Sequence, residues 1–136
     1  MTLAKIRAIC LKFPETTERI QWGDNLVFKV CGKIFAIAST DLPGTPLSFK
    51  CSDEDFAELI EQEGIIPAPY LARAKWVYLE KSDILTPTEL ARRLRISYDL
   101  VVARLPRKDS SRLRAETARG TRRRTAPSLD KKIGKN

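Results

Sequence analysis

A period-2 pattern of apolar residues in the first third of the chain predicts the centre of the fold. Leu26, Phe28 and Val30 form one apolar side of a strand, and residues 33–39 repeat the alternation, as is typical of half-buried β-strands. Between the two runs, Gly32-Lys33 supplies a glycine, which two-residue hairpin turns favour because glycine accepts a positive φ. We therefore predict a β-hairpin, with the remaining elements packed around it.

Apolar residues spaced three and four positions apart predict helices in three other segments. Each segment contains or follows a hydroxyl residue that is suited to cap a helix N-terminus. Ser97 is another such residue and leaves open whether the last segment is one kinked helix or two. The predicted helices cover residues 2–13, 53–63 and 87–105, with Thr2, Ser52 and Thr86 as their caps.

Two further strands complete the predicted sheet. Residues 47–51 alternate in polarity after a turn rich in Pro and Gly, and Lys75–Glu80 is rich in aromatic and β-branched residues. Glu15–Arg19 is interpreted as a polar connection that leads to a packing corner at Trp22-Gly23, and residues 65–74 as irregular with one short helical turn. The pattern predicts a two-layer α+β fold, with an antiparallel sheet of about four or more strands and helices packed on one face.

The positive charge is concentrated near the C-terminus. The chain of 136 residues carries a net charge of +8, but residues 1–106 contain 14 Lys/Arg and 14 Asp/Glu. Residues 107–136 contain 11 Lys/Arg and 3 Asp/Glu, with few large apolar side chains. Such a segment buries too little surface to offset the entropy cost of ordering it. We therefore expect one folded domain over residues 1–106 and a disordered basic tail over residues 107–136.

Few residues of this chain are suited to catalysis or to metal binding. The sequence has no His, and its three cysteines, Cys10, Cys31 and Cys51, lie in apolar patterns that predict burial. The usual general base and the commonest metal ligand are therefore missing, and neither a glycine-rich phosphate loop nor a Cys-x-x-Cys pair is present. We expect no catalytic residues, metal or cofactor. Because no apolar run approaches the roughly 18 residues of a membrane span, we also expect a cytoplasmic protein.

A series of short motifs is distributed over the first 108 residues: Phe13-Pro14-Glu15, Trp22-Gly23, Phe28-Lys29-Val30, Gly32-Lys33, Phe35-Ala36, Leu47-Ser48-Phe49-Lys50, Pro69–Ala74, Trp76–Leu79, Ser97-Tyr98, Val101, Leu105 and Pro106. Taken together and in this order, they resemble the MmcQ/YjbR family of small bacterial proteins. The resemblance implies an antiparallel sheet with helices packed against it. The family has been compared with the double-wing DNA-binding domain of the phage transcription factor MotA, which implies DNA binding by analogy of fold. The basic tail lies outside the family pattern.

The residues and the resemblance together favour a non-enzymatic DNA-binding protein. Cations on the outer sheet face and at the hairpin tip would contact phosphates, with Trp76 and Tyr78 interleaved among them, and the tail would add sequence-independent affinity. Candidate binding residues are Lys29, Lys33, Lys50, Arg73, Lys75, Arg107, Lys108, Arg122, Arg123 and Arg124.

Besides a small-molecule sensor or enzyme, which would need a deep pocket with convergent polar groups, two other interpretations of the same residues remain open. The first is a protein- or peptide-interaction module, which is favoured by the neutral charge of residues 1–106 and by the apolar residues Val27, Cys31, Trp76 and Tyr78. The second is a simple solvated sheet face, whose lysines only prevent pairing with another sheet edge. A contiguous exposed apolar patch would favour the interaction module, whereas a surface of one positive sign would favour nucleic acid.

Overall fold

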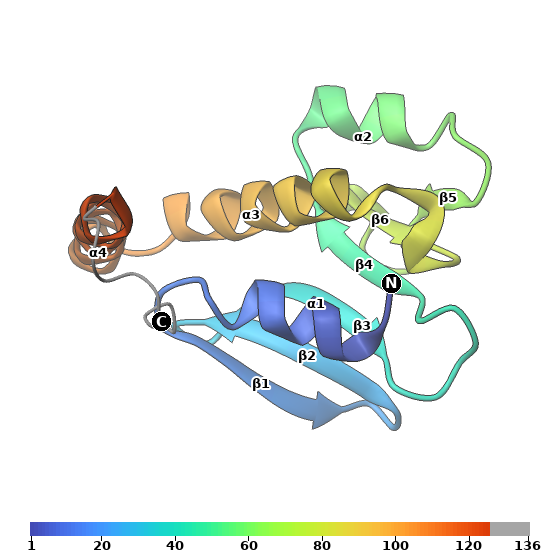
Figure 1. The fold of residues 1–136 in the computed structure, drawn as a ribbon. Coiled ribbons are helices and arrows are strands. Elements are labelled where there is room, and N and C mark those ends of the chain that lie inside the picture. The colour runs from blue at the N-terminus through green and yellow to red at the C-terminus, as the bar shows by residue number, and fades with distance from the viewer. Residues whose placement is uncertain (126–136) are drawn as a thin grey trace.

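The described part of the protein consists of a six-stranded sheet and four α-helices (Figure 1). The computed structural model describes the backbone of residues 1–125 and the side chains of residues 1–117. The helices are α1 (Leu3–Cys10), α2 (Asp53–Leu59), α3 (Pro87–Ala103) and α4 (Arg107–Thr125), and two 3-10 turns are η1 (Ala72–Ala74) and η2 (Ser82–Ile84). The strands are β1 (Thr16–Gln21), β2 (Asn25–Val30), β3 (Lys33–Ser39), β4 (Leu47–Lys50), β5 (Ile65–Pro67) and β6 (Trp76–Leu79).

The sheet is antiparallel throughout and has the strand order β1-β2-β3-β4-β6-β5. Its inner face packs against α1 and α3, as the shared core cluster of Ile6, Phe28, Phe35, Leu94 and Tyr98 shows. All five of these side chains are at most 1% exposed. The structure therefore confirms the predicted α+β class and the placement of the helices on one face of the sheet.

The predicted capping residues begin the helices as expected. The side-chain oxygens of Thr2, Ser52 and Thr86 accept hydrogen bonds from the backbone N–H groups three residues later, at distances of 3.1–3.2 Å. These bonds satisfy donors that have no partner within the helix. From Pro87 the third helix runs unbroken to Ala103, which decides between one helix and two.

The hairpin turn lies one residue earlier than predicted. Cys31 and Gly32 form the two-residue turn, with φ values of 49° and 78°, and Lys33 already belongs to β3. Two positive φ values match the turn that fits the right-handed twist of a hairpin. A turn position leaves the Cys31 side chain exposed, so the prediction that all three cysteines are buried was wrong for this one.

Two segments that were not predicted as strands pair with the sheet. Thr16–Gln21 is the edge strand β1, with Glu18 opposite Phe28 of β2, and Ile65–Pro67 is the opposite edge strand β5. The polar residues of β1 give no hydrophobic alternation, and β5 is only three residues long, so neither segment has a recognisable strand pattern in the sequence. Trp22 follows β1 in a surface turn and is 61% exposed, which overturns its interpretation as a packing corner.

Residues 107–117 fold against the domain, although the sequence predicted disorder from Arg107. They form the first turns of α4, and Leu113 is only 1% exposed. One buried leucine, supported by polar contacts to the domain, orders a segment whose composition alone favours disorder. In Figure 1, α4 lies beyond the C-terminal end of α3 and far from α2. Residues 126–136 and the side chains of residues 118–125 lie outside the described part, so the prediction for that portion of the tail stays a prediction.

Candidate nucleic-acid interface

The sheet face opposite the helices carries the predicted lysines. The register places Lys50 beside Trp76 and Ser48 beside Tyr78, on the face away from the core. Trp76 is only 6% exposed, so its ring is not available for stacking on a base, whereas Tyr78 is half-buried. A row across all six strands runs along this face through Arg19, Val27, Ile37, Ser48, Tyr78 and Ile66.

Two of the apolar residues behind the interaction-module hypothesis are not accessible. Val27 is fully buried and Trp76 nearly so. Cys31 is exposed, but it lies at the hairpin tip and not on the strand face. Among the described residues, the large apolar side chains that are exposed lie mostly in other places, just after α1, in turns and on the edge strands: Leu11, Ile20, Trp22, Leu42, Ile66 and Tyr70.

A serine of α3 replaces part of the sheet hydrogen bonding between β3 and β4. The Ser97 hydroxyl donates to the Phe35 carbonyl at 2.6 Å and accepts from the Lys50 N–H at 2.9 Å. Ser97 is fully buried, so α3 is fixed at the end of β4. Next to it, the Tyr98 hydroxyl donates to the Pro14 carbonyl at 2.6 Å, and burial raises the pKa of this phenol. Of the two alternatives that the sequence left open, the structure therefore excludes the one in which Ser97 caps a second helix.

Lys50 of β4 is hydrogen-bonded to η1, next to the predicted cations Arg73 and Lys75. Its Nζ donates to the Ala74 carbonyl at 2.6 Å, and Ala74 lies between Arg73 and Lys75 in the chain. Arg73 is exposed, whereas the Lys75 ammonium lies over the Phe56 ring of α2, 5.1 Å from its centroid. Lys75 is thus directed toward α2, which separates it from the other cations.

The start of α4 lies beside the hairpin tip. The Arg112 guanidinium donates two hydrogen bonds to the Glu15 carboxylate, at 2.9 and 2.8 Å, and approaches Cys31 Sγ at 3.6 Å. Hydrogen bonds to Glu15 and then to Asp109 raise the pKa of Arg112. Arg107 and Lys108 belong to the same first turns of α4 and are exposed. Lys33 follows the hairpin turn, so the structure brings these three cations to one end of the molecule.

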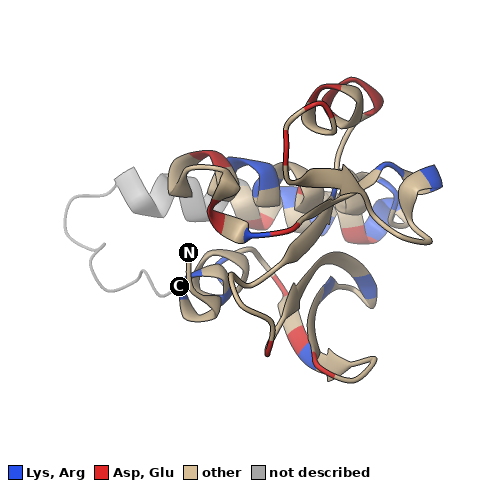
Figure 2. Ribbon diagram, turned by 90° about the vertical axis from the view of Figure 1, so that its right-hand side faces the viewer, with Lys and Arg blue, Asp and Glu red and all other residues tan. Residues whose placement is uncertain are grey.

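The acidic residues of the domain are concentrated elsewhere. Residues 53–63 contain six Asp/Glu and no Lys/Arg, which leaves 14 Lys/Arg and 8 Asp/Glu in the remainder of residues 1–106. Figure 2 shows red segments and no blue ones on α2, at the top of the molecule. The neutral total charge of residues 1–106 therefore conceals a separation between an acidic α2 region and a remainder with a net charge of +6.

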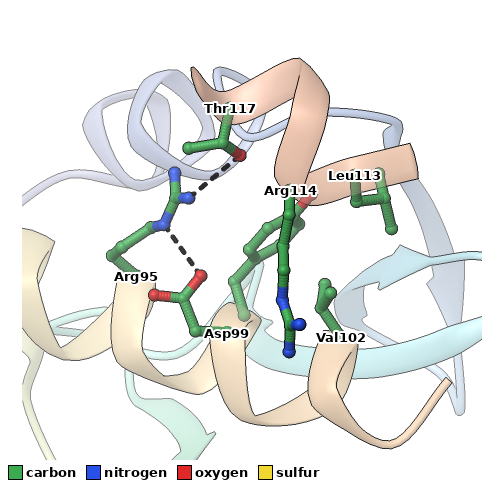
Figure 3. A pocket seen from close by; sticks show the side chains of 7 residues that line it. Arg95, Asp99, Val102, Leu113, Arg114 and Thr117 are labelled. Atoms are coloured by element: carbon green, nitrogen blue, oxygen red, sulfur yellow. Dashed lines mark hydrogen bonds and ion pairs between the residues drawn. The ribbon is translucent and has the colours of Figure 1, made fainter. Parts of the chain in front are cut away.

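A cleft of about 290 Å³ lies between α3 and α4 (Figure 3). Arg95 occupies one side, where it donates to Asp99 at 3.0 Å and to Thr117 at 3.2 Å. Its guanidinium also lies 5.2 Å from the centre of the Tyr98 ring. Arg114 extends from α4 toward α3 in this view. Arg95 already contacts Asp99, Thr117 and Tyr98 and is therefore not free to bind a ligand. The cleft is best explained as part of the contact between α3 and α4.

The buried cysteines are poorly suited to nucleophilic chemistry. Burial raises the pKa of Cys51 to about 11 and raises that of Cys10 farther, so both remain protonated thiols near neutral pH. Among residues 1–117, no three His, Cys, Asp or Glu side chains are grouped as metal ligands. None of the helices in the described part of the chain combines the length and hydropathy of a membrane span.

Sequence reasoning missed two cations that the structure adds to this surface. Arg104 is the C-cap residue of α3. Burial, and then the positive charge of Arg104, lower the pKa of Lys50. Arg112 joins α4 to Glu15 next to the hairpin tip. Neither residue stands out in the sequence, because only the fold shows where the end of α3 and the start of α4 lie. The side chains of Arg122, Arg123 and Arg124 lie outside the described residues.

Comparison with known proteins places this fold in a family. The crystal structure of Deinococcus radiodurans protein DR2400, which carries a DUF419 domain, has a TM-score of 0.75 and 26% identity, with 82% of this chain and 87% of that chain covered. A protein from Pseudomonas syringae has a TM-score of 0.62 and 20% identity, with 74% of this chain and 98% of that chain covered, and shows a similar fold. No match is found among curated proteins. The YjbR family model matches residues 11–100, which is more than half of the sequence, and the chain therefore belongs to the YjbR family.

Proposed function

We propose that this protein binds DNA without catalysing a reaction, through phosphate contacts from one basic end of the molecule. The observation that carries the proposal is the separation of charge. Lys33 lies at the hairpin tip beside the start of α4, where Arg107 and Lys108 are exposed. The acidic residues 53–63 lie apart from them on and after α2. Phosphate contacts of this kind give affinity that is independent of sequence and dependent on salt.

The open sheet face supports the same proposal in a more limited way. Lys29 and Lys50 lie on this face, and Arg73 lies at its margin beside Ala74, the residue that Lys50 contacts. Lys75 contributes less, because its ammonium is engaged with Phe56. Since Trp76 is buried, the proposed contacts are made with the phosphate backbone and not with unstacked bases.

The experiment is a salt titration of the full-length protein with a labelled DNA duplex, followed by fluorescence anisotropy. If about five cations contact phosphates, the logarithm of the affinity falls with the logarithm of salt with a slope of about −4.5, and the affinity drops about 500-fold between 50 and 200 mM NaCl. An absence of binding to duplex at low salt would contradict the proposed function.

Substitutions then assign the binding to the folded domain or to the tail. We expect Arg107→Gln/Lys108→Gln and Lys29→Gln/Lys33→Gln each to reduce the magnitude of the salt slope, by about 0.9 for each phosphate that the variant no longer contacts. The matched control is a double substitution of two exposed cations away from this end of the molecule, on α1 and on the β6–η2 connection.

This control, Lys5→Gln/Lys81→Gln, has the same net charge as either double variant, and it is expected to leave the slope nearly unchanged. A triple variant, Arg122→Gln/Arg123→Gln/Arg124→Gln, measures the contribution of the tail. If only the triple variant weakens binding, the folded domain has no part in DNA contact, and the proposal fails for residues 1–117.

A further inference from the structure

Helix α4 is docked on the domain along one of its sides. Leu113 of this side is 1% exposed. The Arg112 guanidinium donates to the Glu15 carboxylate at 2.9 and 2.8 Å. Arg95 of α3 donates to the Thr117 hydroxyl at 3.2 Å. Because these contacts reach both α3 and the segment before β1, residues 107–117 have a fixed orientation relative to the domain.

The charges of α4 are divided between its covered side and its exposed side. Covered and exposed residues follow each other with the period of a helix between residues 107 and 117. The two acidic residues, Asp109 and Glu116, are half-buried and lie on the covered side with Leu113. The exposed side of this segment carries cations and small residues: Arg107, Lys108, Ser111, Arg112, Arg114 and Ala115.

The helical backbone extends this pattern beyond residue 117, as far as Thr125. At about 3.6 residues per turn, positions 119 and 122 fall on the same side of the helix axis as Arg107 and Lys108, and both positions are arginine. The sequence of α4 has no Asp or Glu after Glu116. A rise of about 1.5 Å per residue makes the positive stripe from position 107 to position 122 about 22 Å long.

We infer that α4 is the element that enters the major groove of the bound DNA, with its exposed side toward the duplex. This inference rests on the proposed function and assigns the contact to one helix and one groove. The major groove is about 12 Å wide and admits an α-helix, and the phosphates along its edges accept contacts from cations. Ser111 and Ala115 are small, so they allow the helix to approach the bases closely. The exposed side of residues 107–117 has no large apolar residue, unlike a helix that binds a membrane surface.

The first variant adds negative charge to the exposed side without removing a contact to the domain. Ser111→Glu/Ala115→Glu should reduce the magnitude of the salt slope for duplex binding by about 1.8, because each new carboxylate offsets about one cation. The matched control, Ala4→Glu/Thr88→Glu, adds the same charge at exposed positions in the first turns of α1 and α3. The control should change the slope by less than half as much. Equal effects of the two pairs would show a dependence on net charge alone and would overturn the inference.

The second variant separates a DNA-binding helix from a flexible basic tail. Gly120→Pro keeps every charge, but proline clashes with the carbonyl four residues earlier and breaks or kinks a helix. If the cations act from one helix, the contact from position 122 is lost and the slope falls in magnitude by about 0.9 or more. The control Ser128→Pro lies beyond the last residue of α4 and should leave the slope unchanged. Wild-type binding by Gly120→Pro overturns the inference, since a flexible tail needs no helix.

Folding is checked for each variant by its thermal unfolding midpoint. If the glutamate pair lowers the midpoint, Gly120→Pro carries the test alone, because position 120 lies beyond the docking contacts of Leu113, Arg112 and Thr117. A single strand of the same length is titrated beside the duplex, and equal or tighter binding of the single strand overturns the assignment to a groove. Duplex binding that weakens in Lys29→Gln/Lys33→Gln but not in the glutamate pair keeps the proposed function and overturns this inference. An absence of duplex binding by the wild type contradicts both.

Discussion

Removing the Ser97 hydroxyl tests how α3 is fixed to the sheet. In the Ser97→Ala variant, the Phe35 carbonyl and the Lys50 N–H both lose their partner, at positions where the wild-type distances are 2.6 and 2.9 Å. An unpaired buried polar group costs about 1–3 kcal/mol. The carbonyl is buried, whereas water can reach the partly buried N–H more easily, so the second cost lies at the low end of that range. The expected loss is about 2–4 kcal/mol of the free energy of unfolding.

The matched control for this change is Ser111→Ala. Ser111 is exposed on α4, and alanine improves helix propensity at both positions by about 0.5 kcal/mol, so the difference between the variants isolates the hydrogen bonds of Ser97. Urea unfolding followed by far-UV circular dichroism and tryptophan fluorescence measures both variants. Faster hydrogen exchange at the Lys50 amide should accompany the loss. A difference below about 1 kcal/mol, with unchanged m-values, would refute the bridging role.

Three other changes test contacts elsewhere in the fold. Tyr98→Phe removes the donor to the Pro14 carbonyl and should cost about 1–2 kcal/mol in urea unfolding; an unchanged midpoint would show that this bond contributes nothing. Cys31→Asn should raise stability by about 0.5–1 kcal/mol, because asparagine tolerates the positive φ of this turn better than cysteine, and a lowered midpoint would contradict the strain argument. The hydrogen bond from Arg7 lowers the pKa of Glu18, so its stabilisation is complete above the usual Glu pKa and is lost as pH falls through the lowered value. Acid titration of Arg7→Gln should therefore show a smaller loss of stability over that range than the wild type, and an identical loss would contradict it.

The sequence predicted those elements whose hydrophobic periodicity and capping residues are local. The hairpin, the three capped helices and the α+β class follow from spacing and from Thr2, Ser52 and Thr86, since their contacts lie within a few residues. The edge strand β1 was missed because its polar residues give no alternating pattern. The order of residues 107–117 was missed because it depends on Leu113 contacting a distant part of the chain.

Some residues of the candidate site could likewise be predicted from the sequence, and others could not. Lys50 could be singled out from the strand pattern, because alternation places it opposite to the core side chains of β4. Arg112 could not be singled out, since its position beside the hairpin tip depends on hydrogen bonds to Glu15 over a long sequence separation. The exposure of Cys31 and Trp22 was also unpredictable from composition, because both occupy turns with positive φ that carry them out of the strand pattern.

Net charge proved a poor guide to this surface because it sums over residues that do not lie together. Residues 1–106 are neutral only when the six acidic residues of residues 53–63 are counted with the rest. In Figure 1, α2 and α4 lie at opposite ends of the molecule, and charges farther apart than about 8 Å are largely screened at physiological ionic strength. A phosphate that approaches the start of α4 therefore responds mainly to the charges there, which are the cations Lys33, Arg107, Lys108 and Arg112 and the carboxylates Glu15 and Asp109. The relevant quantity for the proposed DNA binding is the local charge at this end, and it is positive before any residue of the tail beyond 117 is counted.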